Sequence, residues 1–315
     1  MDEPQIEERT TKNSGSLLPT SILVAAIIIA SAWIYTTKLK TDQYQKLTAN
    51  TKNTSGQNEN TAQAVEIPVT WGNIGAQMIA SGVINRAQFE AIYANRGGLT
   101  DDEKKLLENN GGKMIINQEN SGFILNLFWA LGLSNKNKIL EEGPMADPRY
   151  GGAGGFASTG GWTIAKGGAM NHYSKHSFVT LTPEQQTLVE QVSSNIYRPC
   201  CDNSTYFPDC NHGMAMLGLL ELLASQGANE NQMYKVALQV NSFWFPEQYA
   251  IIARYFASKG QTLGTIDPKE ILGKTYSSAS GFRRIASLVP ETNSQGRGIG
   301  CGLETAPQKS SGCGL

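Results

Sequence analysis

A stretch of 25 residues without a charged side chain, residues 13–37, is the strongest constraint on what this chain can fold into. Its centre, from Leu17 to Tyr35, is rich in isoleucine, leucine, valine and alanine. At a rise of about 1.5 Å per residue, roughly twenty helical residues cross the ~30 Å hydrocarbon core of a bilayer. Trp33 and Tyr35 lie at one end, where amphipathic aromatic side chains favour the membrane interface. The stretch therefore predicts a transmembrane helix over residues 17–37.

A buried core helix and a cleaved signal peptide are two other interpretations of this stretch. Residues 30–32 read Ala-Ser-Ala, the small-residue pattern of a cleavage site. The preceding region is long, however, and lacks the basic character of a signal peptide. It carries four acidic residues, Asp2, Glu3, Glu7 and Glu8. We therefore expect an uncleaved anchor in a single-pass membrane protein.

The orientation of this anchor is indicated by two opposing signals. Two basic residues precede the stretch closely, and four follow it, at positions Lys38, Lys40, Lys46 and Lys52. Taken alone, the positive-inside rule places the large C-terminal part in the cytoplasm. The clustered cysteines and the polar linker instead favour an oxidising exterior. We expect the folded domain to be extracytoplasmic.

Composition divides the chain into five segments. These are a polar tail (1–16), the transmembrane helix (17–37), a flexible linker (38–64), an α-helical domain with a Cys/His cluster (65–292) and a Gly/Cys tail (293–315). The linker has almost nothing to bury. The last segment holds two Gly-Cys-Gly triplets, around Cys301 and Cys313, which could close a disulfide loop or form a flexible arm carrying two thiols.

Apolar residues recur at helical spacing through most of the domain, so we expect a mainly α fold, an irregular helical bundle. The expected helices lie within residues 71–95, 100–109, 123–133, 182–197, 214–226, 229–243, 246–258 and 280–285, with a short one starting at residue 267. Thr100 and Glu103 have the spacing of a capping box, and Thr182 followed by Pro183 marks another helix start. The helix from Met214 is apolar almost all round and is expected in the core.

Two further features limit the function classes. Only 17% of the residues are charged, the net charge is −1, and no basic run is present, which argues against a nucleic-acid-binding surface. The glycine-rich residues 143–168 fit neither a P-loop nor a dinucleotide fingerprint, so we expect a surface loop there.

The segment from Cys200 to His212 is the main candidate site. It contains three of the five cysteines and one of the three histidines within thirteen residues. Thiolates and an imidazole together can hold a metal ion, exchange disulfides or act as nucleophiles. Cys210 is expected just before the Met214 helix, where the helix dipole favours a thiolate.

Three interpretations of this cluster remain open at the level of sequence. Cys210 could form a structural disulfide with Cys200 or Cys201. Cys200, Cys201, Cys210 and His212 could instead bind zinc or copper, although the spacing is not the usual pair of C-x-x-C motifs. Finally, the thiols could carry out redox or nucleophilic chemistry, without the C-x-x-C of a thioredoxin-type site.

Three more ionisable residues enter these interpretations. His172 and His176 have the i, i+4 spacing that places two side chains on one helical face, so they are candidate metal ligands, although a polar surface turn also fits. Glu221 is the one ionisable residue in the apolar Met214 helix, and we expect it to pair with an arginine or lysine.

The sequence thus predicts a membrane-anchored, extracytoplasmic domain with a Cys/His site that binds a transition metal or performs thiol redox chemistry. The alternative is a non-enzymatic surface binding or scaffold protein whose cysteines form structural disulfides. The expected partner is the membrane, through the N-terminal helix. Neither a protein partner nor a substrate follows from the sequence, and the question of enzymatic activity stays open.

Overall fold

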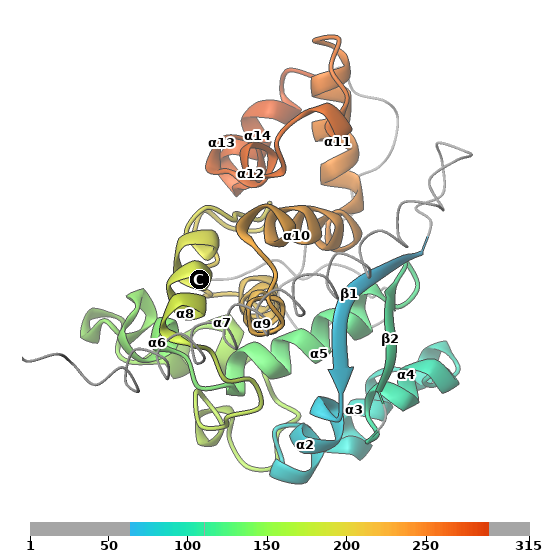
Figure 1. The fold of residues 1–315 in the computed structure, drawn as a ribbon, viewed down its shortest axis with the longest axis vertical. Coiled ribbons are helices and arrows are strands. Elements are labelled where there is room, and N and C mark those ends of the chain that lie inside the picture. Colours follow the sequence, from blue (N-terminus) through green and yellow to red (C-terminus); the bar gives the residue numbers. More distant parts are fainter. Residues whose placement is uncertain (1–63, 110, 290–315) are drawn as a thin grey trace, which may run out of the picture.

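The computed structural model describes residues 64–109 and 111–289, which form a mainly α-helical domain with one small sheet (Figure 1). The predicted fold class is confirmed for these residues. The predicted anchor, the polar tail, the linker up to residue 63 and the Gly/Cys tail lie outside them. Within the described part of the chain, every helix is too short or too polar to span a bilayer.

The helices and strands follow one another along the chain with few long gaps. In order they are β1 (Val65–Gly72), α2 (Ile74–Ser81), α3 (Arg86–Ile92), α4 (Asp101–Leu106), β2 (Gly111–Ile116), α5 (Ser121–Ser134), α6 (Lys138–Glu142), α7 (Ala157–Gly160), α8 (Pro183–Ser193), α9 (Asn211–Ser225), α10 (Glu230–Trp244), α11 (Pro246–Ala257), α12 (Pro268–Leu272), α13 (Lys274–Ser277) and α14 (Ala279–Ala286). Both predicted capping signals are confirmed, because Thr100 and Thr182 each form a capping box, with Glu103 and Gln185.

The sheet pairs β1 with β2 in antiparallel register, with Val65 opposite Ile116 and Gly72 opposite Gly111. The sequence analysis missed this sheet and extended a helix back to Trp71. The side chain of Trp71 is buried instead at the end of β1, where its indole nitrogen donates to the carbonyl of Leu106 at 2.8 Å.

Helices α5 and α9 cross at the centre of the main hydrophobic core (Figure 1). Glycines face each other at the crossing: a Cβ atom on Gly132 would lie 2.9 Å from the backbone nitrogen of Gly218, and a Cβ on Gly218 would lie 2.5 Å from the carbonyl oxygen of Phe128. Any larger side chain would push the two backbones apart. All of α9 from Asn211 to Ala224 is buried, which confirms the predicted core position of this helix.

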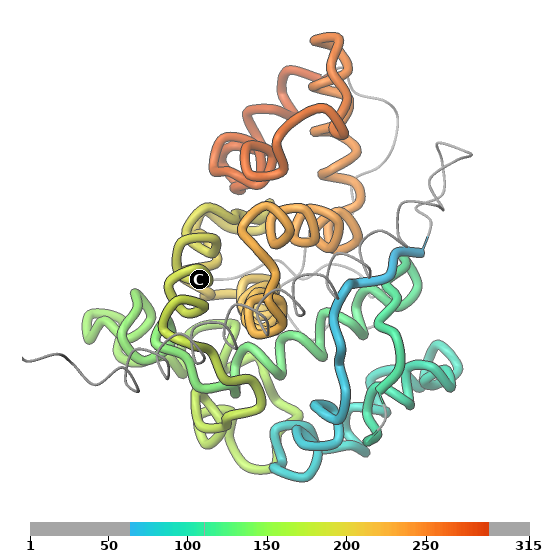
Figure 2. Tube along the Cα trace, viewed as in Figure 1, coloured from blue at the N-terminus to red at the C-terminus, as the bar shows by residue number. Residues whose placement is uncertain are grey.

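The C-terminal lobe, residues 246–289, has its own apolar cluster beside the main core. Figure 2 shows its helices as the orange-to-red part of the tube, at the end of the molecule away from α2 and α3. Its buried side chains include Tyr249, Ile252, Phe256 and Ile271. Cys200 packs against this cluster, so the cysteine segment lies where the lobe meets the main core.

The glycine-rich residues 143–168 differ from the expected surface loop. They contain three short 3-10 helices, at Pro144–Ala146, Pro148–Tyr150 and Ala153–Gly155, followed by α7. Ser158 and Thr159 in α7 are fully buried, and the carbonyl of Ser158 accepts a hydrogen bond from the Trp129 indole at 2.6 Å. The segment therefore packs into the core at α7.

Candidate metal centre

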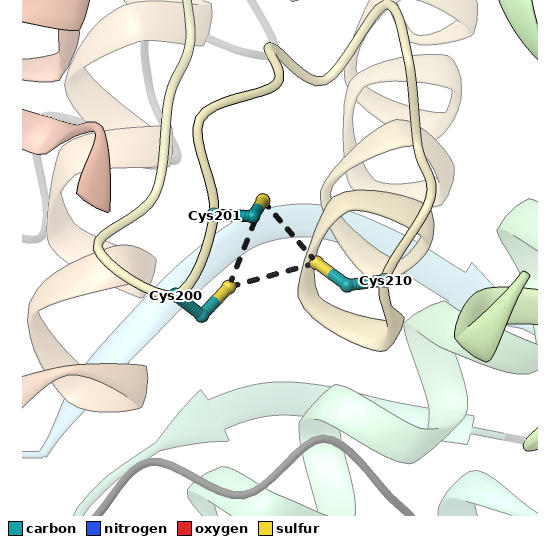
Figure 3. Close-up of side chains that lie close together, drawn as sticks. All are labelled: Cys200, Cys201 and Cys210. Atoms are coloured by element: carbon teal, nitrogen blue, oxygen red, sulfur yellow. Dashed lines mark hydrogen bonds between the residues drawn. The ribbon is translucent and has the colours of Figure 1, made fainter. Parts of the chain in front are cut away.

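Three cysteine sulfurs converge at the N-terminus of α9 (Figure 3). Cys210 is the N-cap residue of α9, and Cys200 and Cys201 lie in the loop that precedes it. The Sγ–Sγ distances are 3.6 Å for Cys200–Cys210, 3.8 Å for Cys201–Cys210 and 4.0 Å for Cys200–Cys201. The Cys210 side chain is buried, whereas Cys200 and Cys201 are half-buried. We call these three sulfur atoms the sulfur triangle.

Backbone hydrogen bonds fold the loop so that the cysteines meet. Arg198 and Cys201 form an antiparallel bridge, and the amide of Thr205 donates to the carbonyl of Ile196 at 2.8 Å. The amide of Tyr197 donates to the carbonyl of Leu272 at 2.8 Å, which ties the loop to the C-terminal lobe. The loop therefore returns on itself and presents both of its thiols to Cys210.

The three thiols are free, so the disulfide interpretation is wrong for Cys200, Cys201 and Cys210. Cys301 and Cys313 lie outside the described residues.

A buried arginine, which the sequence analysis did not identify, lies against the sulfur triangle. Arg198 is 1% exposed, and its Nε donates to the Cys210 sulfur at 3.1 Å. Its Nη2 forms an ion pair with Asp209 at 2.6 Å, and its Nη1 donates to the carbonyl of Asn203 at 2.9 Å. Since a buried cation needs compensating charge, the sequence signal for this group was a carboxylate, Asp209, directly before a cluster cysteine.

The hydrogen bonds shift the pKa values of the three thiols in opposite directions. Donation from Cys200 and Cys201, together with the nearby guanidinium of Arg198 and a hydrogen bond from His212, holds the pKa of Cys210 well below its usual range. Donation to the neighbouring sulfurs and burial raise the pKa of Cys200 well above its usual range. At Cys201, the hydrogen bond from Cys200 lowers the pKa of the thiol. The hydrogen bond that Cys201 donates to Cys210, together with burial, outweighs this effect and raises the pKa to about 12.

The sulfur triangle has the dimensions of a thiolate metal site. A tetrahedral ion with metal–sulfur bonds of about 2.3 Å holds its sulfurs about 3.8 Å apart, and the three observed separations lie on either side of this value. In the part of the chain that the structure describes, these thiols are the one group of three or more Cys, His, Asp or Glu side chains close enough together to share an ion. The three cysteines could therefore hold a metal.

His212 lies beside the sulfur triangle but is not part of it. Its imidazole forms a hydrogen bond with Cys210 and packs on the Phe245 ring with a centroid distance of 4.4 Å. Its ring nitrogens do not belong to the group of ligand atoms that converge on one point. The structure thus brings together three of the four ligands expected from the 200–212 segment and places the fourth in contact with one of them.

His172 and His176 lie outside the sulfur triangle and form a pair of their own. Nδ1 of His172 is 3.1 Å from Nε2 of His176, and Nε2 of His172 is 3.0 Å from the carbonyl of Lys166. The expectation that they share a helical face is wrong, since a 3-10 helix ends at Asn171 and His176 forms a backbone bridge with Asn135. The chain turns between them, and this turn brings the two rings together.

Glu221 does not have the arginine or lysine partner that the sequence analysis expected. Its carboxylate oxygens accept hydrogen bonds from Asn135 Nδ2 at 3.0 Å and Asn137 Nδ2 at 2.6 Å. The side chain is fully buried, and burial raises the pKa of its carboxyl group well above the usual range. The two asparagines belong to the end of α5 and the start of α6, so Glu221 joins α9 to these elements.

Comparisons of the chain with protein-family models, with curated proteins and with solved structures found no match. The chemistry of the centre is therefore argued from its own geometry.

Proposed function

We propose that this protein binds a thiophilic metal ion, zinc or copper(I), through the thiolates of Cys200, Cys201 and Cys210. The observation that carries the proposal is the sulfur triangle, whose edges of 3.6, 3.8 and 4.0 Å match the separation of ligands around one such ion. Zinc and copper(I) bind thiolate sulfur readily, whereas magnesium, calcium and manganese ions prefer the oxygen atoms of carboxylates.

Charge at the centre supports the same function. Three thiolates around a divalent ion leave one excess negative charge, and a buried site needs that charge offset. The guanidinium of Arg198 lies 3.1 Å from Cys210 Sγ, and it places a positive charge, shared with Asp209, beside the thiolates. Burial of Cys210 protects one ligand from solvent, while the half-buried Cys200 and Cys201 leave a route for the ion.

Metal analysis of the purified full-length protein, combined with a count of free thiols, tests this proposal. We expect about one zinc or copper ion per chain, and loss of most of it in Cys210→Ser, because a metal ligand must be a deprotonated sulfur. His176→Ala is the matched control and should retain the ion, since the histidine pair lies outside the sulfur triangle. A parent protein without metal and with all cluster thiols free would exclude a metal centre.

A second candidate function, thiol–disulfide exchange, is favoured by the low pKa of Cys210 next to a protonated thiol. In this reaction the Cys210 thiolate attacks a disulfide of a partner molecule and releases one partner thiolate. The Cys200 thiol, 3.6 Å away, then loses its proton and attacks Cys210, which releases the second partner thiol and leaves a Cys200–Cys210 disulfide. Incubating the metal-free protein with oxidised glutathione and mapping disulfides by mass spectrometry tests this. Only adducts on other cysteines would refute it.

We also propose that residues 17–37 anchor the protein in a membrane with the metal-binding domain outside the cytoplasm. The support is the uncharged stretch of 25 residues, followed by a linker poor in apolar side chains. Protease added to intact cells should remove the domain while leaving a cytoplasmic marker protein uncut. Cleavage that needs cell lysis would reverse the orientation, and recovery of the chain in the soluble fraction would exclude the anchor.

A further inference from the structure

We propose that His172 and His176 form a second metal site, which binds a divalent transition-metal ion through Nδ1 of His172 and Nε2 of His176. The site uses none of the sulfur atoms of the sulfur triangle and does not depend on the function proposed for it. Imidazole nitrogen is a ligand that suits zinc, copper and nickel ions, so the ion belongs to this class.

The two facing nitrogens have the separation of neighbouring ligands on one ion. Nδ1 of His172 lies 3.1 Å from Nε2 of His176. With metal–nitrogen bonds of about 2.0–2.1 Å, two ligands lie about 2.9 Å apart at an angle of 90° and about 3.4 Å apart at the tetrahedral angle. The observed distance falls between these values. The two rings therefore need to tilt toward a common ion but do not need to move apart.

A hydrogen bond on the far side of His172 prepares Nδ1 for an ion. Nε2 of this ring lies 3.0 Å from the carbonyl oxygen of Lys166, which can only accept, so the proton of the neutral ring is on Nε2. Nδ1 then carries a lone pair directed toward His176. Donation to a backbone carbonyl is the usual outer contact of a metal-binding histidine, because it fixes the tautomer and the ring orientation. The amide of Lys166 donates to the carbonyl of Gly82 at 2.8 Å, which holds the accepting residue in place.

The position of His176 is fixed through its backbone and its ring. Its amide donates to the carbonyl of Ser134 at 2.9 Å, and its carbonyl accepts from the amide of Lys136 at 2.7 Å. Its ring stacks on that of Phe178, with a centroid distance of 5.1 Å and an interplanar angle of 12°. Because both histidines are held before an ion arrives, binding costs little conformational freedom.

The turn between the two histidines has a strained residue, Ser174. Its φ is 52°, and in the part of the chain that the structure describes it is the one non-glycine residue with a positive φ. Its hydroxyl accepts from the amide of Asn137 at 3.1 Å and donates to Glu141 at 3.2 Å, so the turn is held against α6. Strained residues held by their surroundings recur at ligand-binding sites. Here the strained turn brings His176 back beside His172.

Binding balances as a ligand exchange without oxidation. In the metal-free pair, Nε2 of His176 donates to Nδ1 of His172. As the ion binds, the proton of His176 moves from Nε2 to Nδ1 through solvent, two metal–nitrogen bonds form, and two water molecules leave the ion. No net proton is released. His172 is buried and His176 is half-buried, so the ion reaches the pair from the side of His176 and keeps water in its other positions.

Titration of the full-length protein with zinc, beyond the first equivalent, tests the inference. The chain has three histidines, so NMR signals of the labelled imidazole rings show which of them bind. We expect the ring signals of His172 and His176 to shift together in this step, while those of His212 stay unchanged. The readout does not depend on whether the sulfur triangle holds zinc. Unchanged signals of His172 and His176, or a shift of only one of them, would overturn the inference.

Variants measured by calorimetry give a second, independent test. Loss of an outer hydrogen bond costs about 10–100-fold in metal affinity, so removal of a ligand in His172→Ala or His176→Ala should weaken this step by about 100-fold or more. Lys175→Ala is the matched control, since this exposed residue lies between the two histidines, and it should bind as the parent does. Cys210→Ser should also retain this step. Binding of parental strength in either histidine variant would overturn the assignment.

Discussion

The guanidinium group of Arg198 occupies the space that a Cβ atom on Gly213 would need. Such a Cβ would lie 2.5 Å from Cζ and 2.9 Å from Nε of Arg198. Gly213 is in the first turn of α9, and its lack of a side chain lets the arginine lie flat against the helix and reach Cys210. The glycine, the arginine and the cysteine thus form one packed unit.

Gly213→Ala should therefore displace Arg198 from Cys210 and Asp209. We expect a loss of unfolding free energy of about 3–5 kcal/mol, because a buried charge separated from its partners is strongly destabilising. The metal affinity should fall as well, since the positive charge moves away from the thiolates. Chemical denaturation of the variant measures the first effect. The matched control is Gly264→Ala, where a Cβ meets nothing within 4 Å, with an expected change of less than about 0.5 kcal/mol.

Zinc affinity should depend steeply on pH in a predictable direction. The pKa of Cys210 lies well below its usual range, so this thiol contributes least to the release of protons when zinc binds. Cys200 and Cys201 have raised pKa values, so binding at neutral pH releases about two protons. The zinc association constant should then rise about a hundredfold per pH unit from about pH 6.5 to 8. Competition with a chromophoric chelator measures this slope, and an affinity independent of pH would contradict the raised pKa values of Cys200 and Cys201.

Glu221→Gln should remove a pH dependence of stability. Burial raises the pKa of this carboxyl group in the folded state, so folding favours its protonated form. The contribution of Glu221 to the free energy of unfolding is fully present below the pKa of the unfolded state, about 4.3. It is lost as the pH rises toward the pKa of the folded state, by up to about 1.4 kcal/mol per pH unit. The stability of the variant relative to the parent should therefore increase from about pH 4 upward. Denaturation at several pH values checks this, with the exposed Glu142→Gln as control.

Metal binding should protect the C-terminal lobe from hydrogen exchange. The loop that carries Cys200 and Cys201 accepts hydrogen bonds from the amides of Ala279 and Ser280, so fixing the loop also fixes the start of α14. At a zinc concentration of about 100 times the dissociation constant, binding stabilises the folded state by about 2.7 kcal/mol. Amides that exchange only after the metal has left should therefore exchange about a hundredfold more slowly. Mass spectrometry with and without zinc measures this. Amides of β2 are the internal control, and equal protection of both regions would contradict a local coupling.

Local sequence signals were enough to predict most helices. Two helix starts were recognised from their capping residues, Thr100 and Thr182. Helices α5 and α9 were recognised from their apolar runs, and all of these signals lie within the helix itself or directly before it. Strand β1 was missed because its partner β2 lies about forty residues further on, and the pairing has no local signature.

The candidate site was predicted only as far as its cysteines. The spacing of Cys200, Cys201 and Cys210 shows that they can meet, but the burial of Arg198 among them depends on the three-dimensional path of the loop. The prediction of an arginine or lysine partner for Glu221 was wrong for a related reason. A buried carboxylate can be satisfied by amide donors as well as by a cation, and the choice of Asn135 and Asn137 depends on how α5 packs on α9.

The glycine crossing of α5 and α9 determines how the candidate metal centre can open. Because Gly132 and Gly218 allow backbone contact in the middle of the core, α9 cannot slide along or rotate about its axis without a clash. Cys210 at the end of that helix is therefore a stationary ligand. Cys200 and Cys201 belong to a loop and can withdraw while the helix stays in place. An ion would then leave in an ordered sequence, parting from the loop sulfurs first and from Cys210 last, so a transfer partner would receive it from the loop side.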